Sequence, residues 1–454
     1  MPQFARPLPA TTGEAGRRLA GETMSSISRR KVLGAGAATA ALGALTACGS
    51  SGSSHQDSVK TGASSPATDP GGTTAVPSPS GKATPIGDGS TSDTGPQPNQ
   101  PTFSKLKPGE RPPQFVVFSW DGAGATDDGQ FARFLKLAEE HKATFTFFLS
   151  GIYCLPGSKK DLYHPPQHSV GASDIPYLSD GAVKNTIKMI SQAWLQGHEI
   201  GTHFNGHFCS TRPDHNGVNK WSPEDWESEI QQAVGFVTQW RTNTGFTDVP
   251  AFPFDYRKEL IGGRTPCLDG QKGLLPTAAK LGWKYDASSP GEKQTWPQKV
   301  QDGKIWNFPL QSIPYPGHTF EVLSMDYNIM ANQSNGNPKG DPGQFGAWRD
   351  AAHQSYLAGF NRAYNGNRAP FFVGNHFEQW NGGIYMDAVE AVLKDIAGKP
   401  EVQLVSFRQL VQWLELQDEA VLRKLRTLNV GQAPSGGWES FLGTPGGSAS
   451  PSGQ

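Results

Sequence analysis

The middle of the chain, residues 111–426, alternates short apolar runs with longer amphipathic ones, and this alternation constrains the fold most strongly. The runs at residues 115–119, 143–149 and 370–374 are short and rich in Phe and Val, which predicts buried strands. Residues 182–196 carry an apolar stripe at helical spacing and end before a glycine, as many helices do. Repeated strand–helix units predict a parallel sheet covered by helices. We therefore expect an α/β fold that forms one distorted (β/α) barrel.

Further segments continue this pattern to the end of the middle region. Strands are also predicted at residues 198–202, 249–252, 283–286, 305–310 and 402–405, and helices at residues 222–242, 345–364, 384–396 and 407–416. Ser222 and Pro223 are typical of a helix N-cap and of the first helical position. The number of units indicates a single barrel domain.

The two ends of the chain have a different composition. Residues 49–110 consist mainly of Ser, Thr, Gly, Pro and Asp and have almost no large apolar side chains. Such a segment cannot bury a core of its own, so we expect a disordered linker. Residues 427–454 are similar in composition and are expected to form a flexible tail.

The first 48 residues have the features of an export signal. An Arg pair within residues 28–31 precedes an apolar run at residues 32–47, which is too short and too rich in Ala and Gly to span a membrane. The Arg pair resembles a twin-arginine signal, and the sequence Leu-Thr-Ala-Cys that ends at Cys48 is similar to a bacterial lipobox. This resemblance implies a lipid anchor on Cys48 and a place at the outer face of the cytoplasmic membrane or in the cell envelope. The alternative is an ordinary cleaved secretory peptide. Met24 is a candidate for the true start of the chain.

Charge and cysteine usage narrow the classes of partner. The chain has 40 Lys and Arg residues against 41 Asp and Glu residues and no basic block, which argues against a nucleic-acid partner. Apart from Cys48 the cysteines are Cys154, Cys209 and Cys267, so at most one disulfide can form among them. Cys209–Cys267 is the favoured pair, and the absence of any disulfide is an equally open alternative.

Several side chains that can do chemistry follow predicted strands. His203 and His207 are spaced four apart after one strand, and neutral imidazoles are common ligands of Zn²⁺. Asp121, Asp286 and His376 stand at the ends of three other strands. The carboxyl ends of barrel strands share one face, where active sites lie. The sequence therefore predicts one site from these residues, although each alone is more typical of a structural or solvated side chain.

Five segments, in the same order, resemble the five motifs of the NodB-homology polysaccharide deacetylases, a family similar to carbohydrate esterase family 4. They are Ser-Trp-Asp-Gly-Ala at residues 119–123, Gly-His-Glu-Ile-Gly-Thr-His and a second His within residues 197–207, Ala-Phe-Pro-Phe at residues 251–254, Tyr-Asp-Ala-Ser at residues 285–288, and the segment at residues 376–413. The resemblance covers about residues 114–416 and is nearest to the chitin-deacetylase-like branch.

The resemblance implies a metal-dependent hydrolase that removes N-acetyl groups from an envelope or extracellular amino-sugar polysaccharide. It assigns a divalent metal, with zinc expected, to His203 and His207. Asp121 matches the general base and His376 the general acid. Asp286 matches the carboxylate that orients His376 and favours its protonated form.

Two further assignments and two departures complete the comparison with the family. Phe254 matches the residue whose N–H binds the oxyanion, and Trp380 is assigned with it to the substrate. Gly122 stands where the family has a metal-binding Asp, and Ala251 where it has an Arg. The third ligand is therefore unidentified, and Asp121 itself is one candidate. Other candidates are the loop carboxylates Asp127, Asp128, Asp255 and Glu378. A catalytically degenerate lipoprotein that binds glycans, or a hydrolase of another C–N bond, are the alternative functions.

Overall fold

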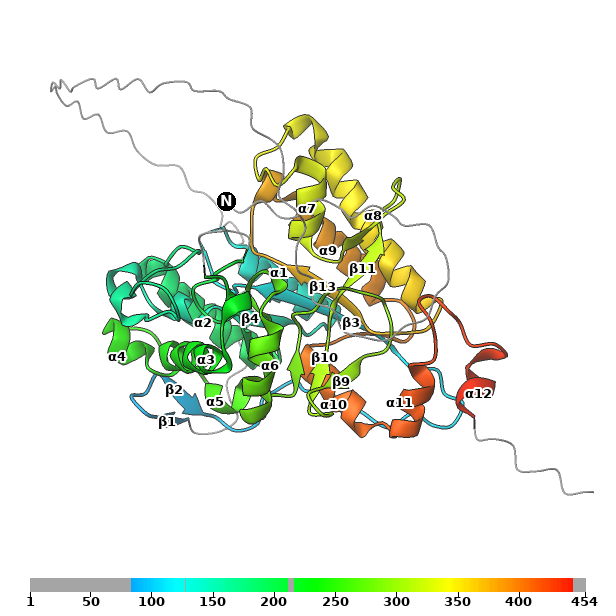
Figure 1. The fold of residues 1–454 in the computed structure, drawn as a ribbon, viewed down its shortest axis with the longest axis horizontal. Coiled ribbons are helices and arrows are strands. Elements are labelled where there is room, and N and C mark those ends of the chain that lie inside the picture. Colours follow the sequence, from blue (N-terminus) through cyan, green and yellow to red (C-terminus); the bar gives the residue numbers. More distant parts are fainter. Residues whose placement is uncertain (1–82, 127, 211–215, 444–454) are drawn as a thin grey trace, which may run out of the picture. The chain divides into compact units, whose positions relative to one another are not determined.

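A curled sheet lies at the centre of the described residues (Figure 1). It has nine strands. The computed structural model describes residues 83–126, 128–210 and 216–443. The strands follow the order β13-β3-β4-β5-β6-β7-β10-β9, with β14 also paired to β3. They are β3 (Gln114–Asp121), β4 (Thr146–Leu149), β5 (Glu199–Thr202), β6 (Gly262–Gly263), β7 (Tyr285–Asp286), β9 (Gln298–Val300), β10 (Ile305–Asn307), β13 (Phe371–Asn375) and β14 (Val402–Leu404).

The strands of this sheet run parallel, except that β9 is antiparallel to β10. The register places the strand ends together: Asp121 is opposite Phe148, Thr202 is opposite Gly263, and Gly263 is opposite Asp286. A curled parallel sheet with its carboxyl ends at one face confirms the predicted distorted (β/α) barrel.

The central strand β3 shows why this sequence forms the middle of the sheet. All eight of its residues are buried. Val116, Phe118 and Trp120 pack into one apolar cluster, whereas Phe115 and Val117 pack into a second. Alternate side chains of a strand point to opposite faces, so a strand covered on both faces reads as an almost continuous apolar run.

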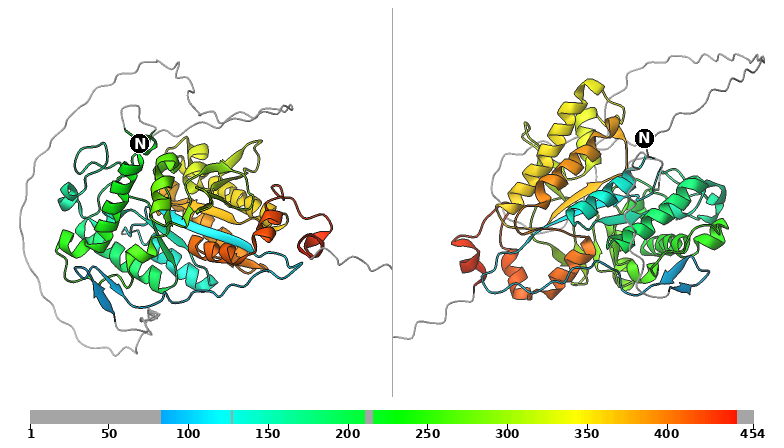
Figure 2. Two further views of the ribbon diagram at one scale, coloured as in Figure 1. Left: turned by 60° about the horizontal axis from the view of Figure 1, so that its bottom comes forward. Right: turned by 180° about the vertical axis from the view of Figure 1, so that it is seen from behind.

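Helices surround the sheet, and Figure 2 shows them from two further directions. They are α1 (Gln130–His141), α2 (Asp180–Leu195), α3 (Pro223–Thr238), α4 (Trp240–Thr244), α5 (Tyr256–Glu259), α6 (Gln271–Lys280), α7 (Asp326–Ser334), α8 (Phe345–Tyr364), α9 (Ile384–Ala397), α10 (Phe407–Leu416), α11 (Glu419–Leu425) and α12 (Gly437–Leu442). Ser222 caps α3 through a capping box with Asp225, as the sequence predicted. The predicted helix at residues 222–242 is divided at Gln239 into α3 and α4.

Shorter elements connect these units. Five strands lie outside the main sheet: β1 (Thr84–Ile86), β2 (Thr91–Asp93), β8 (Pro290–Glu292), β11 (Leu310–Pro314) and β12 (Glu321–Leu323). The 3-10 helices are η1 (Gly151–Cys154), η2 (Gly157–Leu162), η3 (Val218–Lys220), η4 (Pro266–Leu268), η5 (Pro342–Gln344) and η6 (Trp380–Gly383). Among the described residues no helix is both long and apolar enough for a membrane span.

The structure corrects the predicted extent of the linker. The segment from residue 83 to 110 belongs to the fold, although it carries few large apolar side chains. Its anchors are hydrogen bonds: Trp240 Nε1 donates to the carbonyl oxygen of Ser90 at 2.8 Å, and Thr94 Oγ1 donates to that of Pro253. Composition predicts apolar burial but not backbone pairing of this kind, which explains the error.

Two other sequence predictions also differ from the structure. Residues 249–252 do not form a strand of the main sheet, since their pairing is a single bridge between Phe252 and Thr91. Within the predicted flexible tail, residues 437–442 form α12, and its Leu442 is buried in an apolar cluster. The export signal and Cys48 lie outside the described residues.

Candidate active site

A cavity of about 170 Å³ opens at the carboxyl ends of the sheet strands. Asp121, His203, His207 and His376 line it, together with Glu378. The first four come from the ends of β3, β5 and β13 or from the residues that follow them. The structure thus brings together four of the residues that the sequence selected, because strand ends of a parallel barrel meet at one face.

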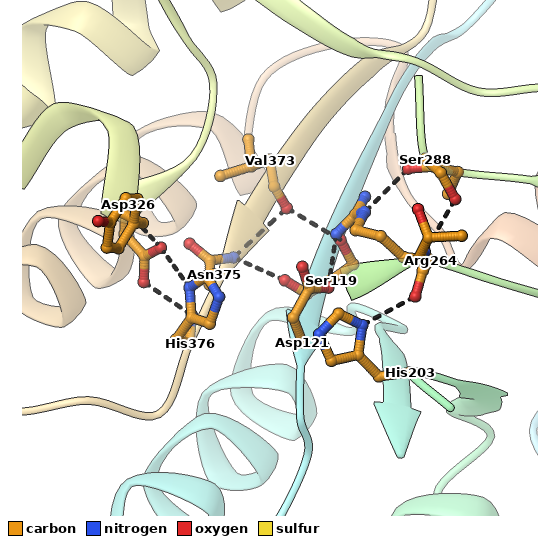
Figure 3. A network of polar contacts seen from close by, with 12 residues as sticks. Ser119, Asp121, His203, Arg264, Ser288, Asp326, Val373, Asn375 and His376 are labelled. Carbon is orange, nitrogen blue, oxygen red and sulfur yellow. Dashed lines mark hydrogen bonds and ion pairs between the residues drawn. The ribbon is translucent and has the colours of Figure 1, made fainter. Parts of the chain in front are cut away.

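Asp121 is held by a buried ion pair with Arg264, which Figure 3 shows. Arg264 Nη1 donates to Asp121 Oδ1 at 2.8 Å and to Ser119 Oγ at 2.9 Å, and its Nε donates to the carbonyl oxygen of Ala287. Burial alone would raise the pKa of the Asp121 carboxyl, but the charge and hydrogen bond of Arg264 and the charge of the protonated His376 outweigh it and lower that pKa. Asp121 is therefore an ionised carboxylate at neutral pH.

Arg264 corrects the placement of the third motif. The sequence comparison put this motif at residues 251–254, with Ala251 in place of the arginine. Arg264-Thr265-Pro266 follows β6 and supplies the guanidinium that residue 251 lacks. The signal was an Arg-x-Pro sequence that begins thirteen residues after Ala251. It was missed because β6 consists of two glycines, which have no strand propensity.

Phe254 accordingly lies outside the site. Its ring packs against Trp194, with the ring centroids 5.5 Å apart, and it lines a different pocket beside Lys258 and Glu259. The oxyanion role expected for Phe254 therefore has no geometric support. Cys267, which is the residue after Arg264-Thr265-Pro266, occupies the corresponding place in the corrected motif.

His203 and His207 stand side by side, with their ring centroids 5.0 Å apart. His203 Nδ1 lies 2.8 Å from the carbonyl oxygen of Arg264, to which it must donate a proton, so Nε2 carries the lone pair. Burial lowers the pKa of His203, and it lowers that of His207 to about 3. Both imidazoles are therefore neutral, which is the form that binds a metal.

This donor set fits a divalent metal. A ligating His usually donates its other ring N–H to an oxygen, as His203 does to Arg264. Two neutral imidazoles line one cavity with the carboxyl groups of Asp121 and Glu378, and imidazole and carboxylate are the donor types of catalytic zinc sites.

The remaining candidates for a third ligand are placed less favourably. Asp255 caps α5 and approaches Lys258, and it lines a different pocket. Asp128 is exposed. Burial raises the pKa of the Glu378 carboxyl, and the charges of Asp326 and Asp128 raise it further, against the opposing charge of His376. Asp127 lies outside the described residues. Glu378 is thus the carboxylate that reaches the cavity besides Asp121.

His376 is paired with Asp326 instead of Asp286, which corrects the sequence assignment. Asp326 Oδ1 lies 2.8 Å from His376 Nδ1, and Oδ2 accepts from the backbone N–H of His376 at 2.7 Å (Figure 3). Burial opposes protonation of His376, but Asp326 overcomes this and raises the pKa to about 9. The acid form of His376 therefore predominates at neutral pH.

Asp286 has a local role instead. Its Oδ1 accepts a hydrogen bond from Ser288 Oγ at 2.6 Å, and burial raises its pKa to about 6. Asp326 was missed because it begins α7, fifty residues before His376 in sequence, where no strand ends in a recognised motif. The Met325–Gly374 bridge brings the start of α7 beside β13.

Aromatic side chains shape the walls of the site. Trp380 stands beside His376, with ring centroids 5.2 Å apart, and packs edge-on against Tyr327. Tyr153 lines the cavity and approaches Gly122, where a Cβ atom would lie 3.8 Å from its hydroxyl. The predicted contact of Trp380 with substrate is compatible with its partly exposed ring next to His376.

A disulfide joins the two loops that carry the site. Cys209 follows His207, and Cys267 follows Arg264, so the Cys209–Cys267 bond connects the loop after β5 with the loop after β6. This is the favoured pair of the sequence analysis. Cys154 is free and buried.

Comparison with known proteins was made by sequence and by structure. No protein-family model and no curated protein match the chain by sequence. Solved structures with a similar fold are polysaccharide deacetylases. A protein assigned as such in Mycobacterium smegmatis is 13% identical, with a TM-score of 0.40, over 70% of this chain and 95% of that one.

Two further structures show the same degree of similarity. The family 4 carbohydrate esterase from Streptomyces lividans, solved with acetate, is 11% identical at a TM-score of 0.32, over 64% of this chain and 91% of that one. The peptidoglycan deacetylase PdaC from Bacillus subtilis is 10% identical at a TM-score of 0.33, over 69% and 96%. Scores this low carry no functional argument, so function is argued from the site itself.

Proposed function

We propose that the protein is a metal-dependent hydrolase that removes N-acetyl groups from an envelope or extracellular amino-sugar polysaccharide. The observation that carries the proposal is the cavity in which an ionised carboxylate, two neutral imidazoles and a protonated imidazole meet. General acid–base catalysis needs a base and an acid whose environments shift their pKa values in opposite directions, as they do for Asp121 and His376.

His203 and His207 would hold the metal, with Asp121 and Glu378 as the cavity carboxyl groups available to complete the ligand set. When bound there, a divalent metal supplies Lewis acidity toward the acetamide carbonyl and toward water. Zn²⁺ suits two histidines and a carboxylate. The missing carboxylate at Gly122 predicts weaker binding than in a site with a fixed aspartate at that position.

Asp121 accepts a proton from the attacking water, and the water oxygen adds to the acetamide carbon. His376 then donates its Nε2-bound proton to the leaving amine as the C–N bond breaks, which yields acetate and a free amino group. Nδ1 is engaged by Asp326, so Nε2 is the atom that can face the substrate. Arg264 fixes the carboxylate of Asp121, and Asp326 keeps His376 protonated.

The test is acetate release from N-acetylated glucosamine oligomers and from peptidoglycan fragments. Asp121→Asn and His376→Ala should each lower kcat by about 10²–10⁴-fold. His353→Ala is the matched control, since His353 pairs with Asp395 outside the cavity. A metal-loaded wild-type protein that binds these glycans but releases no acetate would contradict the proposal and favour the degenerate, glycan-binding alternative.

We propose further that the protein is exported and lipid-anchored through Cys48, so that its substrate lies outside the cytoplasm. The Arg pair, the apolar run and the lipobox-like ending support this. Cys48→Ala should release the protein from the membrane fraction, with Cys154→Ala as the control. Unchanged membrane association of the Cys48→Ala protein would contradict the anchor.

A further inference from the structure

The disulfide Cys209–Cys267 lies directly beside His207. The Nδ1 atom of His207 is 3.6 Å from Sγ of Cys209 and 3.9 Å from Sγ of Cys267. These three donor atoms all lie within 4.8 Å of one another. His203 differs from His207 here, because the Nδ1 atom of His203 donates to a carbonyl oxygen. The Nδ1 atom of His207 therefore lies beside the two sulphur atoms.

One imidazole nitrogen and two thiolates are the protein ligands of many zinc sites, with a water or a fourth residue completing a tetrahedron. Disulfide sulphur does not serve in this way, because the ligand is the thiolate. We propose that reduction of the Cys209–Cys267 bond converts His207, Cys209 and Cys267 into a second metal site, which binds a divalent cation with affinity for thiolates, such as Zn²⁺ or Cd²⁺.

The redox step is a two-electron reduction by a dithiol. The S–S bond breaks, each sulphur gains one electron and one proton, and the dithiol is oxidised to its own disulfide. Binding of the cation then releases the two thiol protons to solvent. His207 and Cys267 are half-buried, so a small reductant and a hydrated cation can reach the group, whereas Cys209 is buried.

Other contacts keep the two loops together after the S–S bond is broken. The backbone N–H of Arg264 donates to the carbonyl oxygen of Thr202, and His203 Nδ1 donates to the carbonyl oxygen of Arg264. Ser210 Oγ donates to the carboxylate of Asp269. These bonds join the same loops on either side of the disulfide, so the three donors remain close to one another in the reduced protein.

The proposed site shares His207 with the cavity, and reduction therefore sets the two sites in competition for one residue. The inference goes beyond the deacetylase function and does not depend on it, because thiolate ligation has its own spectroscopic signature. His203 separates the two sites: it lines the cavity but does not belong to the group formed by His207, Cys209 and Cys267.

The experiment is a titration of the metal-free full chain with Cd²⁺, monitored by thiolate-to-cadmium absorption in the ultraviolet. The chain carries Cys48→Ala and Cys154→Ser, so that Cys209 and Cys267 are its only cysteines. A phosphine serves as the reductant, because it competes only weakly for the metal. It reduces the disulfide and is itself oxidised to the phosphine oxide, with the oxygen taken from water. We expect the absorption to saturate at one equivalent in the reduced protein and to be absent in the oxidised protein.

Two substitutions in the same background sharpen the result. His207→Ala should weaken Cd²⁺ binding by at least about tenfold, since even the loss of a residue that only supports a ligand costs that much. His203→Ala should leave the absorption and the affinity unchanged. Circular dichroism of the reduced protein, compared with that of the Cys209→Ser and Cys267→Ser double variant, shows whether the fold persists.

The proposal is overturned if the reduced, folded protein gives no thiolate absorption, or if His207→Ala binds Cd²⁺ as tightly as its parent. Unfolding of the chain on reduction also overturns it, because the three donors come from separate loops. Loss of the absorption in His203→Ala would show that the thiolate-bound cation also needs His203, which overturns a site formed by His207, Cys209 and Cys267 alone. Acetate release is not a readout, so failure here leaves the proposed function untouched.

Discussion

At the scale of single residues, charge pairs decide what each group in the cavity can do. Asp121 and His376 line the same cavity, but their partners are opposite in sign. Arg264 keeps Asp121 ionised, and Asp326 keeps His376 protonated. The resemblance to the deacetylase motifs assigned the base and the acid to Asp121 and His376, but it named Asp286 as the partner of His376 and placed the partner of Asp121 at Ala251.

The pKa of about 9 for His376 predicts the alkaline limit of activity. The acid form is the active one, so kcat should hold below that value and fall as the pH rises through it. Asp326→Asn removes the charge that raises the pKa, and the alkaline limb should move to lower pH by about one unit or more. A pH profile of kcat for both proteins measures the shift. An unmoved limb in Asp326→Asn would assign the alkaline limit to another group.

Gly122→Asp tests the missing metal carboxylate. Gly122 has a φ of +61°, and a Cβ atom there meets Tyr153 and Ser150 only at ordinary contact distances of 3.7 and 3.8 Å. Asp tolerates this left-handed backbone better than most residues, at a cost of about 1–2 kcal/mol in unfolding free energy. Zn²⁺ affinity should rise, because an anionic oxygen is added.

The control for this change is Gly122→Asn, which has the same shape but no charge. Isothermal titration with Zn²⁺ compares the three proteins. If Glu378 already completes the site, the new carboxylate crowds it and affinity falls, and Glu378→Gln in the parent chain then weakens binding instead.

At the scale of secondary-structure elements, helix α3 fixes the loop between His203 and His207, which follows β5. The carboxylate of Glu229, which is buried in α3, accepts from the backbone N–H of Asn205 at 2.9 Å and from Tyr163 Oη. Tyr163 Oη in turn accepts from the N–H of Gly206. These bonds fix the loop between the two histidines, which has left-handed backbone at Phe204 and His207.

Glu229→Gln should therefore weaken metal binding at a distance. The side-chain amide of the new Gln has an N–H group at a position where Asn205 or Tyr163 already donates. One buried donor therefore loses its acceptor, which lowers the free energy of unfolding by about 1–3 kcal/mol. Zn²⁺ affinity should fall together with stability. Glu227→Gln on the same helix is the control, because Glu227 forms an exposed ion pair with Lys280. Equal Zn²⁺ affinity of Glu229→Gln and wild type would show that Glu229 does not position the loop.

The elements also show where sequence reasoning succeeds and where it ends. Long apolar strands such as β3 and β13, and capped helices such as α3, were predicted because burial and capping leave local patterns. Strand β6 has only two glycines and leaves no pattern, so Arg264 was missed. Asp326 reaches His376 through the pairing of distant segments, which no local pattern records.

At the scale of the whole molecule, the segment before the barrel is a structural part of it. Gln97 Nε2 donates to the carbonyl oxygens of Trp194, at the end of α2, and of His198, directly before β5. The hairpin of β1 and β2 is bonded to Trp240 and Phe252. Hydrogen bonds thus attach the segment that was expected to be a linker to the rest of the fold.

Truncation measures this contribution. A chain that begins at residue 83 keeps every one of these bonds and serves as the reference. A chain that begins at residue 111 leaves the buried indole N–H of Trp240 and the carbonyl oxygens of Phe252 and Trp194 without these partners. Each lost hydrogen bond costs about 0.5–1.5 kcal/mol, so the melting temperature should fall by roughly 5–10 °C. Calorimetry measures the melting temperatures of the two truncated chains. Equal melting temperatures for the chains beginning at residues 83 and 111 would mean that the segment is only a linker.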